Sequence, residues 1–324
     1  MSIKHVTVCG GGVLGSQIAF QTAFHGVDVR VYDISQEALV KTKAALELLP
    51  HRYQHDLHAT AEQAEAVLGR IMFFTDLREA VKGAQLVIEA IPEVMDIKTA
   101  FYRELAGVAD TDTIFATNTS TLLPSQMMEA TGRPAQFLAL HFANPVWIHN
   151  TAEIMPTPKT APQVFDQIVA FARKIGMVAL PLHKEQRGYI INTLSVPLLM
   201  AALKLVVEDV TDPHTVDKTW MIATRAPTGP FASLDVIGLT TAYNISKAAG
   251  DRGNEVNIAI ARYLKEHYLD QGKLGVASGE GFYKYPDPAY LDEDFLKALP
   301  GFQGAEVSSE SSGLSREQPR CRSL

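Results

Sequence analysis

Short apolar runs rich in β-branched residues recur along the first half of the chain, and longer amphipathic stretches separate them. A continuous apolar run of roughly 4–8 residues is typical of a strand buried on both faces, and amphipathic stretches of more than about 10 residues are typical of helices. Their alternation predicts a doubly wound α/β sheet, mostly parallel in its N-terminal part. The predicted strands cover residues 6–9, 27–32, 71–74, 84–91, 113–117, 136–141, 151–155 and 177–182.

Helices are predicted between these strands, over residues 16–24, 36–49, 76–82, 97–108 and 160–175. Four residues are expected to cap amino ends: Ser35, Thr60, Asp96 and Thr160. Pro50 is expected to stop the second helix, because proline breaks a helix interior, and Gly176 to end the last one. Thr60 and Gln63 have the spacing of a capping box, which predicts another short helix in an excursion over residues 51–69.

The pattern changes after residue 188, where helical stretches follow one another without strands, at 189–208, 213–223, 231–249 and 254–271. We therefore predict an α/β domain over residues 1–185 and an all-helical domain over 186–302. Residues 303–324 are rich in Ser, Glu, Gly and Arg, a composition typical of disorder. The first helical stretch is apolar nearly all round, which indicates burial at a domain or subunit interface and favours a homodimer.

A glycine-rich loop joins the first strand to the first helix. Gly10, Gly12 and Gly15 stand at the spacing G-x-G-x-x-G. In this context Gly10 permits a tight turn, Gly12 lets the backbone approach a pyrophosphate, and Gly15 lets helix and strand pack closely. The free N–H groups at the helix start then bind the phosphates. The loop therefore predicts a dinucleotide site formed by Gly10, Gly12, Val13, Leu14 and Gly15.

Asp33 ends the second strand and indicates which dinucleotide is bound. A carboxylate at this position accepts a hydrogen bond from the ribose 2′-hydroxyl and repels a 2′-phosphate. No Arg or Lys directly follows it, since the next residues are Ile34, Ser35 and Gln36. The sequence therefore predicts NAD rather than NADP.

Composition excludes several other classes of protein. A net charge of −7 argues against nucleic acid or an anionic membrane as the main partner. The apolar stretch 189–207 is interrupted by polar residues, so no membrane span is expected. Cys9 and Cys321 form no disulfide framework, which favours a reducing, cytoplasmic compartment, and Cys9 is expected in the core. Three histidines lack the partners of a metal site and are interpreted as a solvated face: His51, His55 and His58.

Further polar residues fall where the predicted strands end, namely Glu93, Asn118, Ser120 and His141. Ligands of doubly wound sheets bind beyond the carboxyl ends of the strands. We therefore expect these four side chains at a ligand site.

Taken together, the motifs of the chain resemble those of the 3-hydroxyacyl-CoA dehydrogenase family, over roughly residues 3–286. The resemblance is strongest to the branch that includes diketoreductase. It implies a Rossmann-type domain followed by a helical domain that dimerises, and NAD-linked interconversion of (S)-3-hydroxyacyl and 3-ketoacyl groups. The motifs are the glycine loop with Asp33, Glu89-Ala-Ile-Pro-Glu93 with Lys98, Asn118-Thr-Ser120, Leu140-His-Phe-Ala-Asn144-Pro145, Glu153, Gly188-Tyr-Ile-Ile-Asn192, Gly229-Pro-Phe231 and Gly279-Glu-Gly-Phe-Tyr-Lys-Tyr285.

The resemblance also implies a role for individual residues. His141 matches the catalytic histidine, whose imidazole takes the hydroxyl proton at neutral pH. Glu153 matches the acid on its other ring nitrogen, which fixes the tautomer and stabilises imidazolium. Positions that hydrogen-bond the substrate oxygen are matched by Ser120 and Asn192. Three further residues are assigned to the surroundings: Asn144 as a partner in the histidine segment, and Glu93 and Lys98 at the cofactor ribose and the active-site mouth.

Two departures from the family concern the acyl carrier. Family members carry lysines on the excursion that meet the CoA phosphates, whereas this excursion holds Arg52, Arg70 and the histidines. Arg187 also stands before Gly188 where many members have a proline-containing turn. Four functions therefore stay open: a 3-hydroxyacyl-CoA dehydrogenase, a reductase of β-keto or β,δ-diketo esters without CoA, an L-gulonate dehydrogenase like the relative of lens lambda-crystallin, and a non-catalytic NADH-binding protein. The set Ser120, His141, Glu153 and Asn192 argues against the last.

Overall fold

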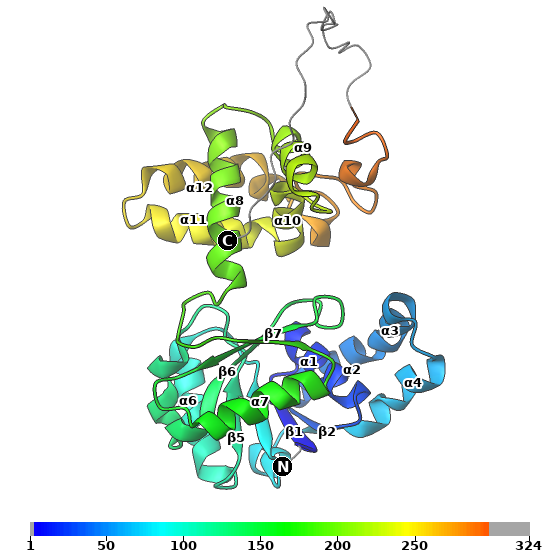
Figure 1. Ribbon diagram of the computed structural model, residues 1–324, viewed down its shortest axis with the longest axis vertical. Helices are drawn as coiled ribbons and strands as arrows, with labels where there is room; N and C mark the ends of the chain where they lie inside the picture. Colours follow the sequence, from blue (N-terminus) through cyan, green and yellow to red (C-terminus); the bar gives the residue numbers. More distant parts are fainter. Residues whose placement is uncertain (1–2, 298–324) are drawn as a thin grey trace, which may run out of the picture. The chain divides into compact units, whose positions relative to one another are not determined.

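The computed structural model describes residues 3–297. The chain forms two compact units, one up to Val196 and one from Pro197 onward (Figure 1). This division falls inside a helix, whereas the predicted domain boundary at residues 185 and 186 precedes that helix. The predicted tail, residues 303–324, lies outside the described residues, and so does Cys321.

The first unit is built on one eight-stranded sheet. The strands lie in the order β3-β2-β1-β4-β5-β6-β7-β8, and all neighbours among these strands are parallel except β6 and β7. The predicted doubly wound, mostly parallel sheet is therefore confirmed. The strands are β1 His5–Cys9, β2 Asp28–Tyr32, β3 Ile71–Phe74, β4 Leu86–Glu89, β5 Ile114–Thr117, β6 Phe137–Phe142, β7 Thr151–Pro156 and β8 Val178–Pro181.

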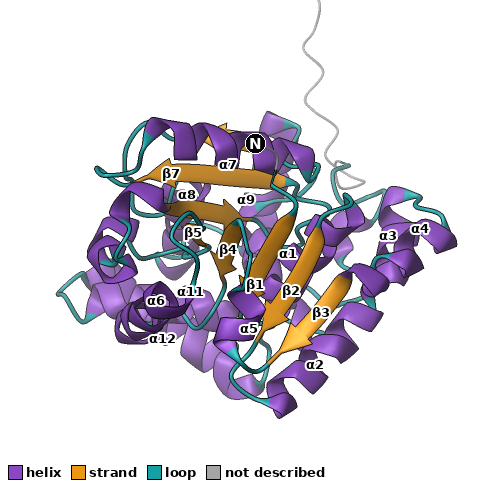
Figure 2. Cartoon of the chain, turned by 90° about the horizontal axis from the view of Figure 1, so that it is seen from below, coloured by secondary structure: helices purple, strands orange, loops and turns teal. Residues whose placement is uncertain are grey.

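Helices cover both faces of this sheet, as the apolar runs require (Figure 2). Alternate residues of β1 point to opposite faces. Val6 and Val8 pack with helices α1 and α7 on one side, whereas Cys9 packs with α5 and α6 on the other. Cys9 is fully buried, as predicted. The helices of this unit are α1 Val13–Phe24, α2 Gln36–Glu47, α3 Leu49–Leu57, α4 Ala61–Ala66, α5 Leu77–Val81, α6 Met95–Val108 and α7 Pro162–Lys174.

Three residues at helix ends do not act as predicted, and α1 begins at Val13 rather than at residue 16. Pro50 lies in the first turn of α3 rather than at the end of α2, a position where its missing N–H costs nothing. Asp96 lies inside the first turn of α6, whose N-cap is Val94. Thr160 donates its hydroxyl hydrogen to the carbonyl of Phe137, so α7 begins after Ala161 instead. Ser35 and the Thr60 capping box cap α2 and α4 as predicted.

The second unit is helical, as predicted. It contains α9 Pro213–Thr224, α10 Pro230–Ile237, α11 Leu239–Gly250 and α12 Glu255–His267, and α8 Ile191–Val207 enters it from the first unit. The predicted helix over 231–249 is two helices, because Gly238 has φ +92° and breaks it. Short 3-10 helices complete the described chain: Leu68–Arg70, Pro124–Gln126, Met128–Thr131, Pro134–Gln136, Leu269–Gln271, Val276–Ser278 and Ala289–Leu291.

Two buried aspartates organise the helical unit. Asp217 accepts hydrogen bonds from the backbone N–H groups of Phe231 (2.8 Å) and Ala232 (2.9 Å). Asp235 accepts from those of Phe282 and Tyr283, both at 2.8 Å. These bonds fasten the start of α10 to α9 and the segment 279–285 to α10.

Candidate active site

The glycine loop leaves an open space at the carboxyl end of β1. A Cβ atom at Gly10 would collide with the carbonyl of Ala90, and one at Gly15 with the carbonyl of Gly10, so both positions require glycine for close packing. A Cβ at Gly12 would meet no protein atom within 4 Å. Val13, the first residue of α1, is 72% exposed, and no side chain caps the helix. The loop therefore presents free N–H groups to solvent, where a pyrophosphate fits.

Asp33 holds this loop from the end of β2. One carboxylate oxygen accepts the backbone N–H of Gly11 and the other that of Ile34, both at 2.8 Å. A further contact that the sequence did not reveal comes from Thr42 on α2, whose hydroxyl donates to the carbonyl of Gly11 (3.0 Å). The carboxylate is thus fixed beside the loop, with lone pairs left for a ribose hydroxyl.

His141 and Glu153 face each other across the antiparallel pair β6–β7. Nδ1 of His141 lies 3.0 Å from Oε2 of Glu153, and both side chains are at least nine-tenths buried. The imidazole stacks on the ring of Tyr189 with centroids 4.4 Å apart. Tyr189 donates its hydroxyl hydrogen to the carbonyl of Thr119 (2.6 Å). Sequence reasoning missed Tyr189, although it lies inside the motif that contains Asn192.

The environment of Glu153 keeps its carboxylate ionised. Burial alone would raise the pKa, but the hydrogen bond from His141 and the N–H groups of Ile191 (3.0 Å) and Ile190 (2.8 Å) lower it. An ionised Glu153 accepts from Nδ1–H, so a neutral imidazole carries its lone pair on Nε2. Within residues 3–297, Nε2 has no hydrogen-bond partner. The pair is therefore arranged to take a proton at Nε2.

The two residues predicted to bind the substrate oxygen, Ser120 and Asn192, also have free polar groups in the described chain. Across the described residues, neither the Ser120 hydroxyl nor the Asn192 amide makes a side-chain hydrogen bond, and both residues are only partly buried. Asn118, expected at the ligand site, accepts the N–H of Phe142 at 3.0 Å with its side-chain oxygen and so ties β5 to β6.

Glu93 and Lys98 lie behind the turn that carries Ser120. Glu93 accepts hydrogen bonds from the Thr119 hydroxyl (2.6 Å) and the N–H groups of Ser120 (2.9 Å) and Thr121 (2.8 Å). Burial would raise its pKa, but these bonds and the charge of Lys98 lower it to about 2. The Lys98 side chain is 1% exposed and its ammonium lies 3.3 Å from Glu93.

A second buried carboxylate completes this charged group. Glu89, which sequence reasoning did not place in the site, accepts from Lys98, from the hydroxyl of Thr117 (2.7 Å) and from that of Tyr102 (3.2 Å). The network fixes the shape of the turn that contains Ser120.

Asn144 connects the histidine segment to the helix that follows the glycine loop. Its side-chain oxygen accepts from Nε2 of Gln17 (2.9 Å), whose own oxygen accepts the N–H of Val146 (2.9 Å). Gln17 lies on α1 and is 8% exposed. Asn144 was expected as a partner in the segment of His141, and its hydrogen bond is to the helix of the cofactor loop.

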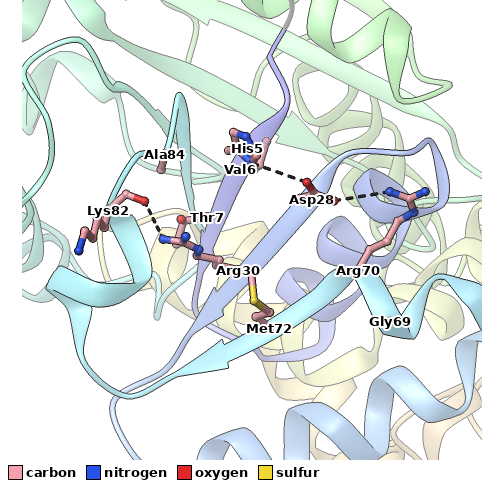
Figure 3. A pocket seen from close by; sticks show the side chains of 10 residues that line it. All are labelled: His5, Val6, Thr7, Asp28, Arg30, Gly69, Arg70, Met72, Lys82 and Ala84. Atoms are coloured by element: carbon pink, nitrogen blue, oxygen red, sulfur yellow. Dashed lines mark hydrogen bonds and ion pairs between the residues drawn. The ribbon is translucent and has the colours of Figure 1, made fainter.

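Neither the excursion nor the opposite end of the sheet offers a metal site. Trp147 donates to Asp56 at 2.7 Å, which holds α3 against the segment after β6. No group of three or more His, Cys, Asp or Glu residues within 3–297 could hold a metal. Figure 3 shows a pocket at the amino ends of β1–β3, where Asp28 lies beside Arg70 (3.5 Å) and His5 (3.7 Å). This pocket lies at the other end of the strands from His141.

A dinucleotide loop with an acidic second strand, beside a buried His–Glu pair, defines an NAD-dependent oxidoreductase. Residues 5–186 match the model of the NAD-binding domain of 3-hydroxyacyl-CoA dehydrogenase, and residues 188–285 match its C-terminal domain. The chain belongs to the 3-hydroxyacyl-CoA dehydrogenase family, as its motifs predicted, and its cofactor is NAD. No helix among residues 3–297 is long and apolar enough to cross a membrane.

Several proteins of the same family align with most of the chain. Human mitochondrial hydroxyacyl-coenzyme A dehydrogenase is 33% identical, over 87% of this chain and 91% of the relative. A probable 3-hydroxybutyryl-CoA dehydrogenase of Bacillus subtilis is 32% identical, over 89% and 99%. Among solved structures, a diketoreductase described as catalysing reactions of dicarbonyl compounds is 54% identical, with a TM-score of 0.84 over 88% of this chain and 100% of the other. An (S)-3-hydroxybutyryl-CoA dehydrogenase from Ralstonia eutropha is 26% identical, with a TM-score of 0.77 over the same shares.

Proposed function

We propose that this chain interconverts (S)-3-hydroxyacyl and 3-ketoacyl compounds, with His141 as general base and Glu153 as its orienting acid. The observation that carries the proposal is the buried 3.0 Å contact between His141 Nδ1 and Glu153 Oε2, with Nε2 left open. The chemistry that bound NAD would supply is a hydride acceptor for the carbon that bears the hydroxyl group. The loop with Gly12 and the carboxylate of Asp33 would hold its pyrophosphate and ribose.

The protein's own residues supply the proton chemistry. Nε2 of His141 takes the hydroxyl proton as the carbonyl forms, and Glu153 stabilises the imidazolium that results. Ser120 and Asn192 would donate to the developing carbonyl oxygen, since both side chains are free of protein partners among residues 3–297. In the reverse direction the imidazolium returns its proton to the oxygen as hydride arrives.

Turnover of acetoacetyl-CoA tests this proposal through the loss of NADH absorbance. His141→Ala should lower kcat by about 10²- to 10⁴-fold, the range of general acid–base catalysis, while NADH still binds. His149→Ala is the matched control, because His149 is exposed and its side chain makes no hydrogen bond in the described chain. A wild-type protein that binds NADH but reduces no 3-keto compound would support the non-catalytic alternative.

A second candidate substrate class is the dicarbonyl esters without CoA. It is favoured by the 54% identity to diketoreductase, against 26–33% to the CoA enzymes named above. The charges near the excursion agree with it. Lys41 pairs with Glu37 at 2.8 Å, and the Lys43 ammonium lies over the ring of Phe73. Arg52 is the cation that remains on α3, so CoA phosphates would be attracted weakly and mainly at low salt.

Comparing kcat/KM for acetoacetyl-CoA with that for a diketo ester, at low and high salt, separates these substrates. We expect activity on both. A preference for the CoA ester beyond about 10⁴-fold corresponds to roughly 5 kcal/mol of differential transition-state binding, and would contradict the dicarbonyl assignment.

We also propose that the protein is a homodimer. Along α8, Ile191 and Leu194 are 52% and 66% exposed in the single chain, which favours cover by a second subunit. Light scattering that shows a stable monomer at micromolar concentration would contradict this.

A further inference from the structure

The turn before α8 carries an arginine whose charge the described protein does not neutralise. Arg187 is exposed, and one of its guanidinium N–H groups donates to the carbonyl of Thr121 at 2.6 Å. Within residues 3–297, no carboxylate forms an ion pair with it. Guanidinium has several N–H donors in a fixed planar fork, so most of them are left without a protein acceptor.

The side chain and the backbone of Arg187 both lie next to residues of the candidate active site. Thr121, which its side chain contacts, directly follows Ser120. Two residues further along the chain from Arg187, the ring of Tyr189 stacks on the imidazole of His141. The guanidinium is therefore held next to the turn that carries Ser120, and its backbone is two residues from the tyrosine that stacks on His141.

We propose that Arg187 binds the free carboxylate of small 3-hydroxy and 3-keto acids, and that such acids are substrates of this site. This inference rests on the proposed function, because it assigns a handle to a substrate oxidised there. Planar, paired N–H donors match a carboxylate, and the bond between two opposite charges is stronger than one between neutral groups. A carboxyl group is separated from the reacting carbon of a 3-hydroxy acid by a single carbon, so the cation that binds it must lie close to the reacting groups, as Arg187 does through its contact with the residue after Ser120.

Glu185, the acid in the same turn, does not neutralise the charge of Arg187. Glu185 accepts the N–H of Ser125 at 2.6 Å, which turns its charge toward a different loop. Glu93, the nearest acid behind the Ser120 turn, is occupied by Lys98 and by the hydrogen bonds of Thr119, Ser120 and Thr121. The positive charge of Arg187 is therefore available to a ligand.

Oxidation of (S)-3-hydroxybutyrate and of its ethyl ester by NAD tests the proposal, because esterification removes the charge of the carboxyl group and adds only an ethyl group. Arg187→Gln should lower kcat/KM for the acid by about tenfold to a hundredfold, the size of a charged hydrogen bond. The ester should change by less than about twofold. Arg187→Lys should keep part of the activity on the acid, since it retains the charge but not the fork.

Lys184→Gln is the matched control, because it removes an exposed positive charge from the same turn and should leave the ratio of acid to ester unchanged. An equal loss on both substrates in Arg187→Gln would mean that Arg187 only anchors the turn, and would overturn the proposal. So would a wild-type protein that oxidises the ester but not the acid. A wild type inactive on both of these and on 3-hydroxybutyryl-CoA would instead refute the proposed function itself. NADH binding, measured by fluorescence, verifies that each variant is folded.

Discussion

Carboxylates that accept several hydrogen bonds occur in both units of this protein, and their pKa values are shifted in opposite directions. In the α/β unit, the pKa values of Glu93 and Glu153 are lowered although partial desolvation would raise them. In the helical unit, burial raises the pKa values of Asp217 and Asp235 even though each accepts two backbone N–H groups. Backbone donors alone therefore do not decide the direction of the shift.

The difference lies in the partners that carry or can acquire positive charge. Glu93 has Lys98 at 3.3 Å, and Glu153 has the imidazole of His141 at 3.0 Å. The side-chain donors of Asp217 and Asp235 in the described structure are neutral tyrosine hydroxyls. A carboxylate hydrogen-bonded or paired to a basic group is arranged for proton transfer or for holding a cation, whereas one whose hydrogen bonds come only from amides and phenols holds a loop in place.

The largest expected effect comes from removing the charge of the catalytic pair. Glu153→Gln keeps the shape but cannot stabilise imidazolium, so kcat should fall by about 10²- to 10⁴-fold. Steady-state kinetics with acetoacetyl-CoA measure this, and NADH binding should be retained. A near-parental kcat would remove Glu153 from the mechanism.

The matched change in the helical unit should affect stability instead. Asp235→Ala leaves the N–H groups of Phe282 and Tyr283 buried without an acceptor, at about 1–3 kcal/mol for each group. Urea unfolding should show a lower free energy of unfolding, while kcat/KM for the folded fraction stays close to the wild-type value. Lost activity without lost stability would reverse the roles assigned to the two units.

Asp33 is a third carboxylate whose charge should act on cofactor choice. The wild type should use NADH more efficiently than NADPH, because the carboxylate repels a 2′-phosphate. Asp33→Asn should reduce that preference by about tenfold, the size of one charged hydrogen bond. Equal use of both cofactors by the wild type would contradict the role of Asp33.

The smallest effects should appear as opposite dependences of stability on pH. The lowered pKa of Glu93 means that its contribution is present above the ordinary value of 4.5 and is lost as the pH falls toward about 2. Glu93→Gln should therefore be less stable than wild type at neutral pH, and the difference should shrink in acid.

The raised pKa of Asp235 has the reverse consequence. Its contribution is complete below the ordinary value of 3.8 and declines as the pH rises through the folded-state value. Asp235→Asn, which cannot ionise, should therefore resemble wild type in acid and gain stability relative to it as the pH rises. Thermal unfolding from pH 2 to 7 measures both variants, and parallel curves would contradict the comparison.

The elements with strong local signals were predictable from the sequence. The β-branched runs gave the strands because a buried parallel strand must be apolar on both faces. The glycine loop and Asp33 were recognisable because their chemistry is contiguous in the chain. The pairing of His141 with Glu153 could be predicted only from the family resemblance, because the sequence of one strand alone does not determine which strand pairs with it or in which register.

Features that depend on distant contacts were not predictable. Burial of Lys98 depends on Glu89, and the role of Gln17 depends on Asn144, which lies in a different part of the chain. Thr160 is of a residue type that commonly caps helices, but its hydroxyl donates to the carbonyl of Phe137 instead. In each case a tertiary partner outcompetes the local interaction that sequence rules describe.

The hydrogen bonds to Oε1 of Glu153, the oxygen that does not contact His141, have a practical consequence for protein engineering. Its bonds to the N–H groups of Ile190 and Ile191 join the catalytic strand to the beginning of α8, which continues into the helical unit. A chimera that exchanges helical domains between relatives at residues 185 and 186 would supply these N–H groups from a foreign sequence. Joining the chains after residue 196 instead would transplant the helical bundle and leave the native donors on the carboxylate, so recombination libraries of this family should place their crossover there.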